Sequence, residues 1–517
     1  MWSAHFKRFA LLLVAATAAR TAGTESVASY APYSVSCPSD NLIRDAYSAQ
    51  NLHPDEASYV RSRQAVAKDA LQGWLKGIGD QVYDGDLSKD MPSISLALSG
   101  GNFRAALFNA AALEAFDSRN GSSVSKGLGG LLQSSNYISA LSGGSYVLAS
   151  LMFNDFASGY DLVFGNNATS GWQLEQSLFA PGPQGQDAQM FITHLIDDLA
   201  AKRFGANFTV TFCDLWGRAL AYHFLPGTTP DSFASNTTAG DHAASLTFSS
   251  ATNLTSWQKH ELPFPLVVIN VNSPNVRGTP FGGNGSVSLQ TVVYELSPLE
   301  FGSYKPQLSS FVPLPYLGST FAGGNPSHCV NGFDNAGLMI GTSSQCDFNP
   351  LNITNSPAWT SPQALGGLVD AVNQTFRALQ PNQEMDVTSV PNPFYGLKVG
   401  TYQDSRERAL ALFDGSLPVD DQNDPLFPLL VKGRKVDVIV ALDSSGETSD
   451  FKPNGQSLLA TKTKVEMLPR GFMNFPTPFP NSTEEFVSLG LNTRPVFFGC
   501  DGASNDSQHF PCVLSYA

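Results

Sequence analysis

The sequence predicts an α/β protein with a mostly parallel central sheet flanked by helices, and with an irregular cap or insertion. Strand-like and helix-like segments alternate between residues 93 and 153, and this alternation is typical of parallel sheets with crossover helices. Apolar strand-like segments return at 263–271 and 435–442, the second being rich in β-branched residues. With 517 residues, 42% of them hydrophobic, the chain is long enough to bury a large core.

The first 20 residues are predicted to be a secretory signal peptide. Lys7 and Arg8 precede an apolar run at 9–16, and the small residues at 16–18 suit cleavage. The run is too short to span a membrane. We therefore expect a protein that is secreted or held at the cell surface through the secretory pathway.

Ten Asn-x-Ser/Thr sequons agree with that route, and each is a candidate glycosylation site on the surface. They are Asn120, Asn167, Asn207, Asn236, Asn253, Asn284, Asn352, Asn373, Asn481 and Asn505.

The elements of the N-terminal half follow from their apolar spacing. Helical periodicity begins after Pro54, whose missing N–H costs little at a helix start. The alternation that follows predicts a helix at 55–77, a strand at 93–98, a helix at 103–116, a return to the sheet at 131–141 and a helix at 145–153.

Domain organisation is predicted to be simple. Residues 21–500 form a single catalytic-type domain, because no Pro/Ser-rich linker divides them. Weak periodicity and several sequons predict an insertion near 160–260. Residues 501–517 are expected to be an atypical C-terminal tail.

Charge and cysteine content narrow the classes of function. The net charge of −14 argues against nucleic-acid binding and against capture by anionic membranes, although contact with zwitterionic lipid remains open. Six cysteines permit disulfides in an oxidising compartment. Closeness in sequence favours a Cys329–Cys346 pair, although spacing does not determine connectivity. No zinc-finger spacing is present, so no metal site is expected.

Residues 140–145 have the layout of a nucleophile elbow, in which a buried strand leads through a sharp turn into a helix. The turn would lift the hydroxyl of Ser142 toward a substrate, with small neighbours allowing the close approach of the helix. The same letters also occur in ordinary surface turns. As a nucleophile, Ser142 would carry out acyl transfer through a serine ester.

Residues 99–105 lie between the first strand and its helix. Gly100 and Gly101 could turn main-chain N–H groups toward the charge of a tetrahedral intermediate, as an oxyanion hole does. An ordinary βα turn is the alternative, whereas a dinucleotide loop lacks its third glycine. Arg104 follows by one helical turn and could hold a phosphate, or it could form a structural ion pair.

The base has two candidate identities. A histidine would have to follow Ser142, and the histidines that do are His194, His223, His242, His260, His328 and His509, none of them in a convincing turn after a strand. The alternative is a Ser–Asp dyad. The apolar segment 410–413 ends at Asp414-Gly415, which fits an acid at the end of a strand, although Asp-Gly is usually a plain turn.

The motifs at 99–105, 141–145 and 413–415 resemble the fungal lysophospholipase (phospholipase B) family, whose catalytic domain is similar to that of cytosolic phospholipases using a Ser–Asp dyad. The resemblance extends from about Tyr30 to Cys500 and includes the stretches 293–303, 329–337, 436–445 and 494–500. It implies that Ser142 is the nucleophile and Asp414 the base. It also implies that Gly100 and Gly101 form the oxyanion hole and that Arg104 steadies the substrate phosphate.

The motifs depart from the family pattern at three places. Asn102 replaces the third glycine of the first motif, and Ala140 stands where glycine is usual before the nucleophile. Ser416 and Leu417 follow Asp414-Gly415 where the family tends to have Gly-Glu.

The resemblance implies a secreted hydrolase of fatty-acyl esters in phospholipids and lysophospholipids, acting at a membrane or micelle surface, with no cofactor. Two alternatives stay open: a neutral-lipid esterase on the same scaffold, and a catalytically impaired lipid-binding glycoprotein, which the departures motivate.

Overall fold

The computed structural model describes residues 30–46, 50–79, 86, 87, 89, 91–182, 185–235, 242–276, 289–344, 386–416, 423–500 and 511–516. Within these ranges the strands form one 12-stranded sheet and one three-stranded sheet. The centre of the large sheet is parallel, in the order β15 (Cys512–Tyr516), β13 (Val438–Leu442), β3 (Ile94–Leu98), β4 (Ser135–Ala140) and β5 (Phe264–Val271). The α/β class is therefore confirmed.

Antiparallel strands extend this parallel centre on both sides and make the whole sheet mixed. β14 (Val496–Phe498) pairs with β15 at one end. Beyond β5 lie β6 (Tyr294–Leu296), β7 (Glu300–Ser303), β8 (Ser310–Pro313) and β2 (Arg44–Asp45). A branch formed by β12 (Ala409–Phe413) and β11 (Thr388–Pro391) joins the end of β5. The three-stranded sheet contains β1 (Tyr33–Val35), β10 (Asn325–Asn331) and β9 (Thr320–Ala322).

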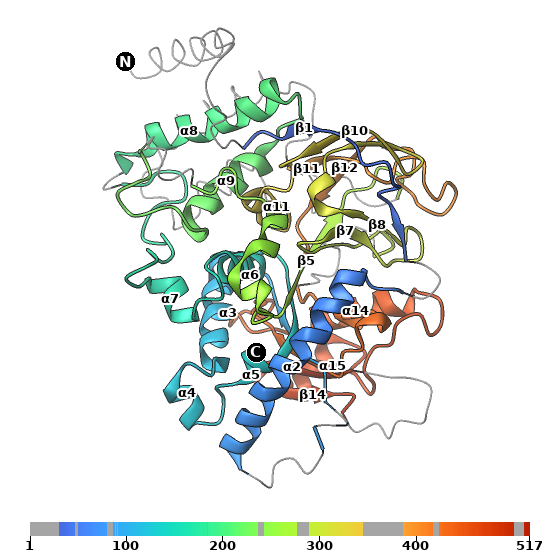
Figure 1. Cartoon of the computed structure of the whole chain (residues 1–517). Coiled ribbons are helices and arrows are strands. Elements are labelled where there is room, and N and C mark those ends of the chain that lie inside the picture. The colour runs from blue at the N-terminus through green and yellow to red at the C-terminus, as the bar shows by residue number, and fades with distance from the viewer. Residues whose placement is uncertain are drawn as a thin grey trace.

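Helices follow the central strands as the alternation predicted (Figure 1). α3 (Asn102–Phe116) follows β3, and α6 (Gly143–Phe153) follows β4. α6 is buried along its whole length, so its largely apolar sequence reflects a core position. The long helix α2 (Pro54–Ile78) is fixed to the start of β4 by buried Arg63, whose Nε donates to the Ser135 carbonyl oxygen at 3.0 Å.

One boundary in this region was predicted wrongly. Residues 131–141 were expected to be strand throughout, but Leu131–Ser134 form a short helix, α5, and the strand begins at Ser135. Leu131 and Leu132 are buried in the helix. A short apolar run is compatible with either structure, so the sequence pattern did not separate them.

The predicted insertion is more helical and more buried than its weak periodicity indicated. It contains α7 (Gly159–Phe164), α8 (Ala188–Ala200), π-helical η2 (Ala201–Gly205), α9 (Phe212–Phe224), 3-10 helix η3 (Phe248–Asn253) and α10 (Thr255–Gln258). α9 packs closely on α11 (Ala336–Thr342), because a Cβ at Gly217 would lie 2.5 Å from the Gly337 carbonyl oxygen. α9 is thus part of the interior.

The remaining helical segments include η5 (Phe427–Leu430), all of whose residues are buried. The others are α4 (Gly121–Ser125), η4 (Leu314–Tyr316), η6 (Lys432–Arg434), α14 (Gln456–Glu466) and α15 (Thr483–Ser488).

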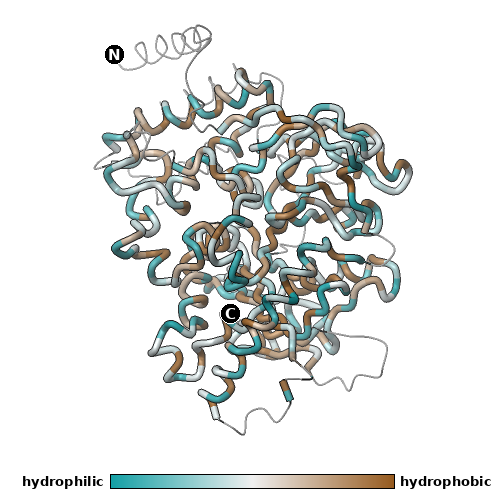
Figure 2. Tube along the Cα trace, in the orientation of Figure 1, coloured by the Kyte–Doolittle hydropathy of each residue, from teal (hydrophilic) through white to brown (hydrophobic). Residues whose placement is uncertain are grey.

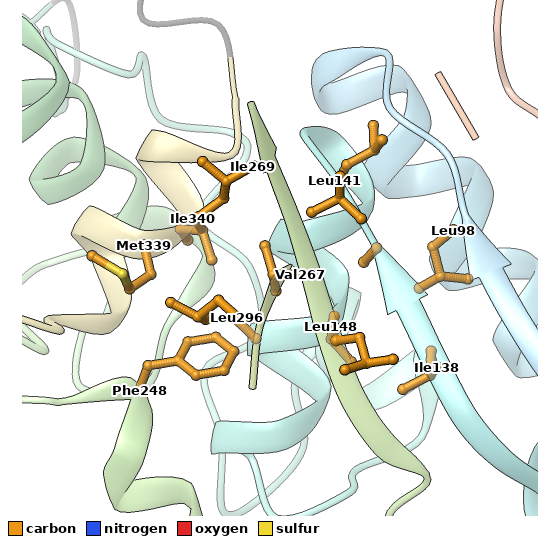
Figure 3. Packing of buried hydrophobic residues seen from close by; sticks show 14 of the residues in the cluster. Leu98, Ile138, Leu141, Leu148, Phe248, Val267, Ile269, Leu296, Met339 and Ile340 are labelled. Carbon is orange, nitrogen blue, oxygen red and sulfur yellow. The ribbon is translucent and has the colours of Figure 1, made fainter. Parts of the chain in front are cut away.

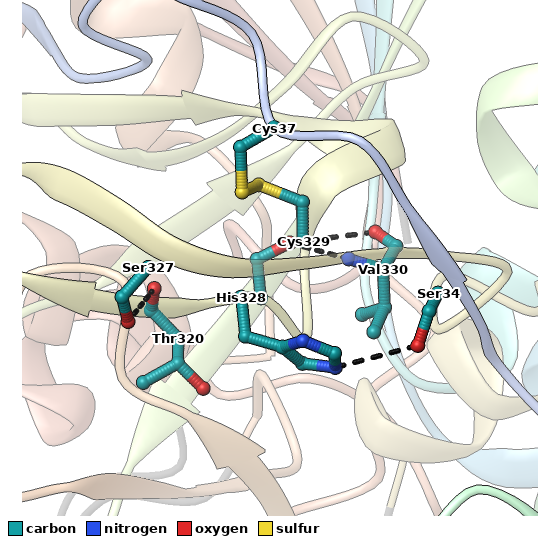
Figure 4. Close-up of a disulfide and its surroundings, with 8 residues drawn as sticks. Ser34, Cys37, Thr320, Ser327, His328, Cys329 and Val330 are labelled. Carbon is teal, nitrogen blue, oxygen red and sulfur yellow. Dashed lines mark hydrogen bonds between the residues drawn. A yellow bond between two sulfur atoms is a disulfide. The ribbon is translucent and has the colours of Figure 1, made fainter.

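Two disulfides have both cysteines among the described residues. Cys37 is bonded to Cys329, which ties β1 to β10 (Figure 4). The expected Cys329–Cys346 pair is therefore wrong, because the antiparallel register places Val35, two residues before Cys37, opposite Cys329. Cys346 lies outside the described residues. Cys500 is bonded to Cys512, and the segment expected as a tail contributes β15 to the interior of the large sheet.

The hydrophobic core lies on both sides of β5. Figure 3 shows Met339 and Ile340 of α11 on one side of that strand, and Leu141, Leu148 and Leu98 on the other. The hydropathy-coloured trace carries its brown stretches mainly through the middle of the molecule (Figure 2). Among the described helices, none is long and apolar enough to cross a bilayer.

Candidate active site

Ser142 occupies a sharp turn between β4 and α6. Its φ of 48° and ψ of −126° lie in a region that non-glycine residues rarely adopt. The two glycines that follow permit close packing: a Cβ at Gly143 would lie 2.2 Å from the Asn102 carbonyl oxygen, and one at Gly144 2.3 Å from that of Leu98. The predicted elbow is present. Ala140, where glycine is usual, is fully buried at the end of β4 and belongs to the core.

Asp414 is brought to Ser142 by the branch of the sheet. β12 runs antiparallel to the end of β5, with Phe413 opposite Asn270. The Asn270 amide donates to the carbonyl oxygens of Asp414 and Gly415 at 3.0 and 2.8 Å, which fixes the turn after the strand. The hydroxyl of Ser142 lies 3.4 Å from Oδ2 of Asp414.

The two carboxylate oxygens of Asp414 have different partners. Oδ1 accepts hydrogen bonds from the Ser416 N–H at 2.8 Å and its hydroxyl at 2.7 Å. Oδ2 faces the Ser142 hydroxyl. Ser142 and Asp414 are both buried, at 5% and 3% exposure. Ser416, a departure from the family pattern, thus orients the acid, while Leu417 lies outside the described residues.

Of the described histidines that follow Ser142, four have contacts with other residues. His223 is buried in α9 with Nδ1 2.8 Å from the Ala219 carbonyl oxygen, and burial lowers its pKa to about 4. His242 lies 2.9 Å from the Thr228 hydroxyl, and His328 contacts Ser34 in the three-stranded sheet (Figure 4). The His260 ring lies 5.0 Å from the Tyr59 ring at a tilt of 50°, and His194 lies in α8. His509 lies outside the described residues.

The loop that contains Gly100 and Gly101, called the glycine loop below, lies directly beside Ser142. A Cβ at Gly100 would be 2.8 Å from that of Ser142. The Gly100 N–H, however, donates to the Asn423 carbonyl oxygen at 3.1 Å. The Gly100 carbonyl accepts the Ser444 hydroxyl at 2.9 Å and the Asn423 amide at 3.3 Å. Gly100 is therefore held by its neighbours, and its N–H is occupied.

The next two residues have an unusual backbone. Gly101 has a φ of 125° and Asn102 a φ of 58°. Asn is among the few non-glycine residues that tolerate this region, so Asn102 keeps a backbone that a glycine would adopt. In the described part of the chain, the main-chain N–H groups of Gly101 and Asn102 donate no hydrogen bond.

Arg104 lies exposed at the start of α3 and turns back over the loop after β13. Its guanidinium donates to the Ser444 carbonyl oxygen. A Cβ at Gly446 would lie 3.1 Å from Nη2 of Arg104 and 3.5 Å from the Phe451 ring. The charge therefore lies next to the glycine loop and beside an aromatic side chain.

Phe451 is unusually exposed for an aromatic residue, at 72%. It has a φ of 59° in a turn closed by the Thr448 N–H donating to the Lys452 carbonyl at 3.1 Å. The Thr448 hydroxyl also accepts from the Lys452 N–H at 2.8 Å. Leu107, one turn after Arg104 on α3, is 44% exposed. An apolar ring and a leucine thus flank the arginine.

Buried carboxyl groups lie behind the glycine loop. Asp424 is fully buried, and its carboxyl oxygens have no hydrogen-bond partner in the described structure. Burial, together with the charges of Asp443 and Glu447, raises the pKa of Asp424 well above its usual value. Burial likewise raises the pKa of Asp443. Within the described ranges, no group of three or more His, Cys, Asp or Glu side chains is arranged to hold a metal ion.

Five of the ten sequons lie among the described residues. Asn167, Asn207, Asn253 and Asn481 are exposed, whereas Asn120 is half-buried and its amide donates to Glu114. Asn236, Asn284, Asn352, Asn373 and Asn505 lie outside the described residues.

Comparison with known proteins identifies the chain's family. The family model of the lysophospholipase catalytic domain matches residues 94–511. The chain belongs to this family. It is 36% identical over 508 residues to lysophospholipase 1 of Aspergillus fumigatus, an alignment that covers 94% of this chain and 74% of the relative. It is 34% identical over 517 residues to lysophospholipase 3 of Saccharomyces cerevisiae, covering 94% and 70%.

Membership of the lysophospholipase family makes the chain a carboxylic ester hydrolase, and the predicted resemblance is confirmed. Among solved structures, human GIVD cytosolic phospholipase A2 has a similar fold, with a TM-score of 0.61 at 17% identity. The match covers 92% of this chain and 59% of that one. The same phospholipase in complex with methyl gamma-linolenyl fluorophosphonate gives a TM-score of 0.58.

Several residues around the dyad were not found from the sequence. Asn423 and Ser444 hold the glycine loop, and Asn270 holds the turn at Asp414 and Gly415, called the acid turn below. Ser444 follows the predicted strand 435–442 and could have been found as a strand-end residue. Asn423 carries no comparable signal, because it is brought to Gly100 by a loop.

Proposed function

We propose that this lysophospholipase-family protein hydrolyses the fatty-acyl esters of phospholipids and lysophospholipids through an acyl-serine intermediate. The observation that carries the proposal is the 3.4 Å approach of the Ser142 hydroxyl to Oδ2 of Asp414 in a buried elbow. Hydrogen bonds of this kind are often long without substrate and shorten in the reacting complex.

In the proposed reaction, the Ser142 oxygen attacks the ester carbonyl carbon while Asp414 accepts the hydroxyl proton. The tetrahedral intermediate collapses by breaking the bond to the alcohol oxygen. That oxygen takes the proton from Asp414 and leaves as the deacylated alcohol. A water molecule then attacks the acyl-serine carbonyl carbon while Asp414 accepts its proton. The bond to the Ser142 oxygen breaks, that oxygen takes the proton from Asp414, and the fatty acid is released.

The negative oxygen of the intermediate requires donors beside Ser142. We assign this role first to the Gly101 N–H, with the neighbouring Asn102 N–H, because both are unengaged in the described structure. Gly100, predicted as a donor together with Gly101, would instead shape the loop, since its N–H donates to the Asn423 carbonyl oxygen. The left-handed backbone of Asn102 supports activity in spite of the missing glycine.

Arg104 is proposed to contact the substrate phosphate. Its guanidinium has more N–H groups than the one used on Ser444, and its planar fork suits a phosphate. The exposed ring of Phe451 beside it is suited to the apolar surface of a membrane or micelle. Together they favour a lipid with a phosphate headgroup presented at an interface.

Entry into the secretory pathway is also proposed, as is glycosylation at the sequons. The basic and apolar N-terminal segment, the Cys37–Cys329 and Cys500–Cys512 disulfides and the four exposed sequons support it. Expression in a fungal host, with and without glycosidase treatment, tests this directly: a cell-associated protein whose mass does not change would contradict it.

The substrate class is tested with purified protein on lysophosphatidylcholine and on a monoacylglycerol, with released fatty acid as the readout. Release from lysophosphatidylcholine supports the proposal. Release from the monoacylglycerol alone favours the neutral esterase. No release from either, in folded protein, favours the impaired lipid-binding glycoprotein.

A further inference from the structure

Ser343 contacts both the turn at Ser142 and the turn that follows Asp414, and it is not itself a member of the dyad. It ends α11 and is fully buried. Its carbonyl oxygen accepts the N–H of Ser142 at 2.8 Å and the N–H of Gly415 at 3.2 Å. One main-chain oxygen thus binds both the nucleophile turn and the residue after the acid.

The hydroxyl of Ser343 adds a third segment. It donates to the Val268 carbonyl oxygen on β5 at 2.8 Å and lies 3.2 Å from the Ser142 N–H, which it also accepts. Val268 in turn is tightly packed against the acid turn, since a Cβ at Gly415 would lie 2.5 Å from its carbonyl oxygen. The side chain therefore fixes where the end of α11 sits relative to β5.

These contacts converge on a helix end. The last carbonyl groups of a helix have no partner within it, and here the residue that caps α11 offers its oxygen to two catalytic loops. Ser142 and Asp414 are 272 positions apart in the sequence, and they reach the site from different strands. Their separation depends on how these strands are held, and Ser343 bridges them.

We propose that Ser343 is a positioning residue that sets the distance between the Ser142 hydroxyl and Asp414. The inference rests on the proposed Ser–Asp mechanism. Ser343 is not a catalytic residue, because it contacts main-chain groups and not the reacting atoms. Its hydroxyl keeps α11 seated on β5, so that the carbonyl oxygen stays between the elbow and the acid turn.

The test is Ser343→Ala, which removes the hydroxyl and leaves the Val268 carbonyl without that donor. A misplacement of about 1 Å at a reacting centre can cost about 100-fold, so we expect kcat to fall about 10- to 100-fold. KM should change little, because Ser343 is buried away from substrate. The rate of labelling by an alkyl fluorophosphonate should fall in parallel, since it reports nucleophile reactivity without the natural substrate.

Thr342→Val is the matched control. Thr342 is the neighbouring buried residue, and its hydroxyl bonds the Leu338 carbonyl and the Thr388 hydroxyl at 2.7 Å each. The variant loses polar contacts in the same helix end without touching either dyad turn. It should lose stability but keep kcat and the labelling rate.

Three results would overturn the inference: Ser343→Ala with wild-type kcat and labelling rate, a loss confined to KM, or equal losses of kcat in Ser343→Ala and Thr342→Val. If Ser343→Ala is not recovered folded, Ser343→Cys, with a weaker donor in the same place, is judged by the same criteria. In each case the unaltered protein stays active, and the proposed function stands. An unaltered, folded protein that neither releases fatty acid nor takes up label would remove both.

Discussion

The hydroxyl of Ser142 and the carboxylate of Asp414 meet at 3.4 Å although 272 positions separate them in the sequence. The first follows a parallel strand, and the second follows an antiparallel strand that joins the end of β5. The pair thus arises from a branch of the sheet. A direct Ser–Asp contact leaves no place for a histidine between the two groups.

Asp414→Asn should therefore inactivate the protein. The amide keeps the size of the side chain but cannot take the Ser142 proton, and we expect kcat to fall about a thousandfold or more. Fatty-acid release from lysophosphatidylcholine measures it, with thermal melting as the check on folding. Alanine variants of His194, His223, His242, His260, His328 and His509 are the controls. A folded histidine variant that loses all activity, beside an active Asp414→Asn, would disprove the dyad.

Arg104→Lys should separate phosphate recognition from a structural role. Lys keeps the charge but loses the planar fork, and a charge-assisted contact is worth about 1.5–3 kcal/mol. We expect kcat/KM to fall about 10- to 150-fold on lysophosphatidylcholine and clearly less on a monoacylglycerol. Because Arg104 also donates to the Ser444 carbonyl, a small loss on both substrates is expected. Equal losses on the two would show that the residue only holds the loop.

The sequence predicted more of the site itself than of the residues that hold the site in place. Ser142 and its turn were readable because an elbow needs a serine between small residues, and Asp414 because a strand ends there. Asn423, Ser343 and Asn270 hold the site through a few hydrogen bonds between segments that are far apart in the sequence, and such contacts leave no periodic pattern. Similarly, the parallel strands were predicted from alternation, whereas the Cys37–Cys329 bond depends on the pairing of β1 with β10, which neither strand's sequence determines.

Phe451→Asn should weaken action at lipid interfaces. Asn tolerates a positive φ, so the turn is expected to remain while the exposed ring is lost. We expect at least a several-fold loss of activity on micellar or vesicle substrate and little change on a short-chain monomeric ester. Phe497, which is 65% exposed on β14, provides the control in Phe497→Asn. Similar losses in both variants, or no interface-specific loss, would remove Phe451 from the interface.

Asp424→Asn should make the protein more resistant to rising pH. Burial and neighbouring acids raise the folded-state pKa of Asp424. Its contribution to stability is therefore fully present below the unfolded pKa of about 3.9 and is lost as pH rises through the higher folded value. Thermal melting of the two proteins from pH 4 to pH 8 measures the effect. The melting temperature of Asp424→Asn, relative to that of the wild type, should increase as pH rises. A difference that stays constant from pH 4 to pH 8 would contradict the raised pKa of Asp424.

In the proposed mechanism, Ser142 carries the acyl group and Asp414 activates it. The most direct measurement is peptide mapping by mass spectrometry after reaction with an alkyl fluorophosphonate, for the wild type, Ser142→Ala and Asp414→Asn. We expect one adduct in the wild type, on the peptide containing Ser142. We expect no such adduct in Ser142→Ala and labelling slowed about a hundredfold or more in Asp414→Asn. An adduct on another residue, or labelling of Asp414→Asn at the wild-type rate, would contradict it.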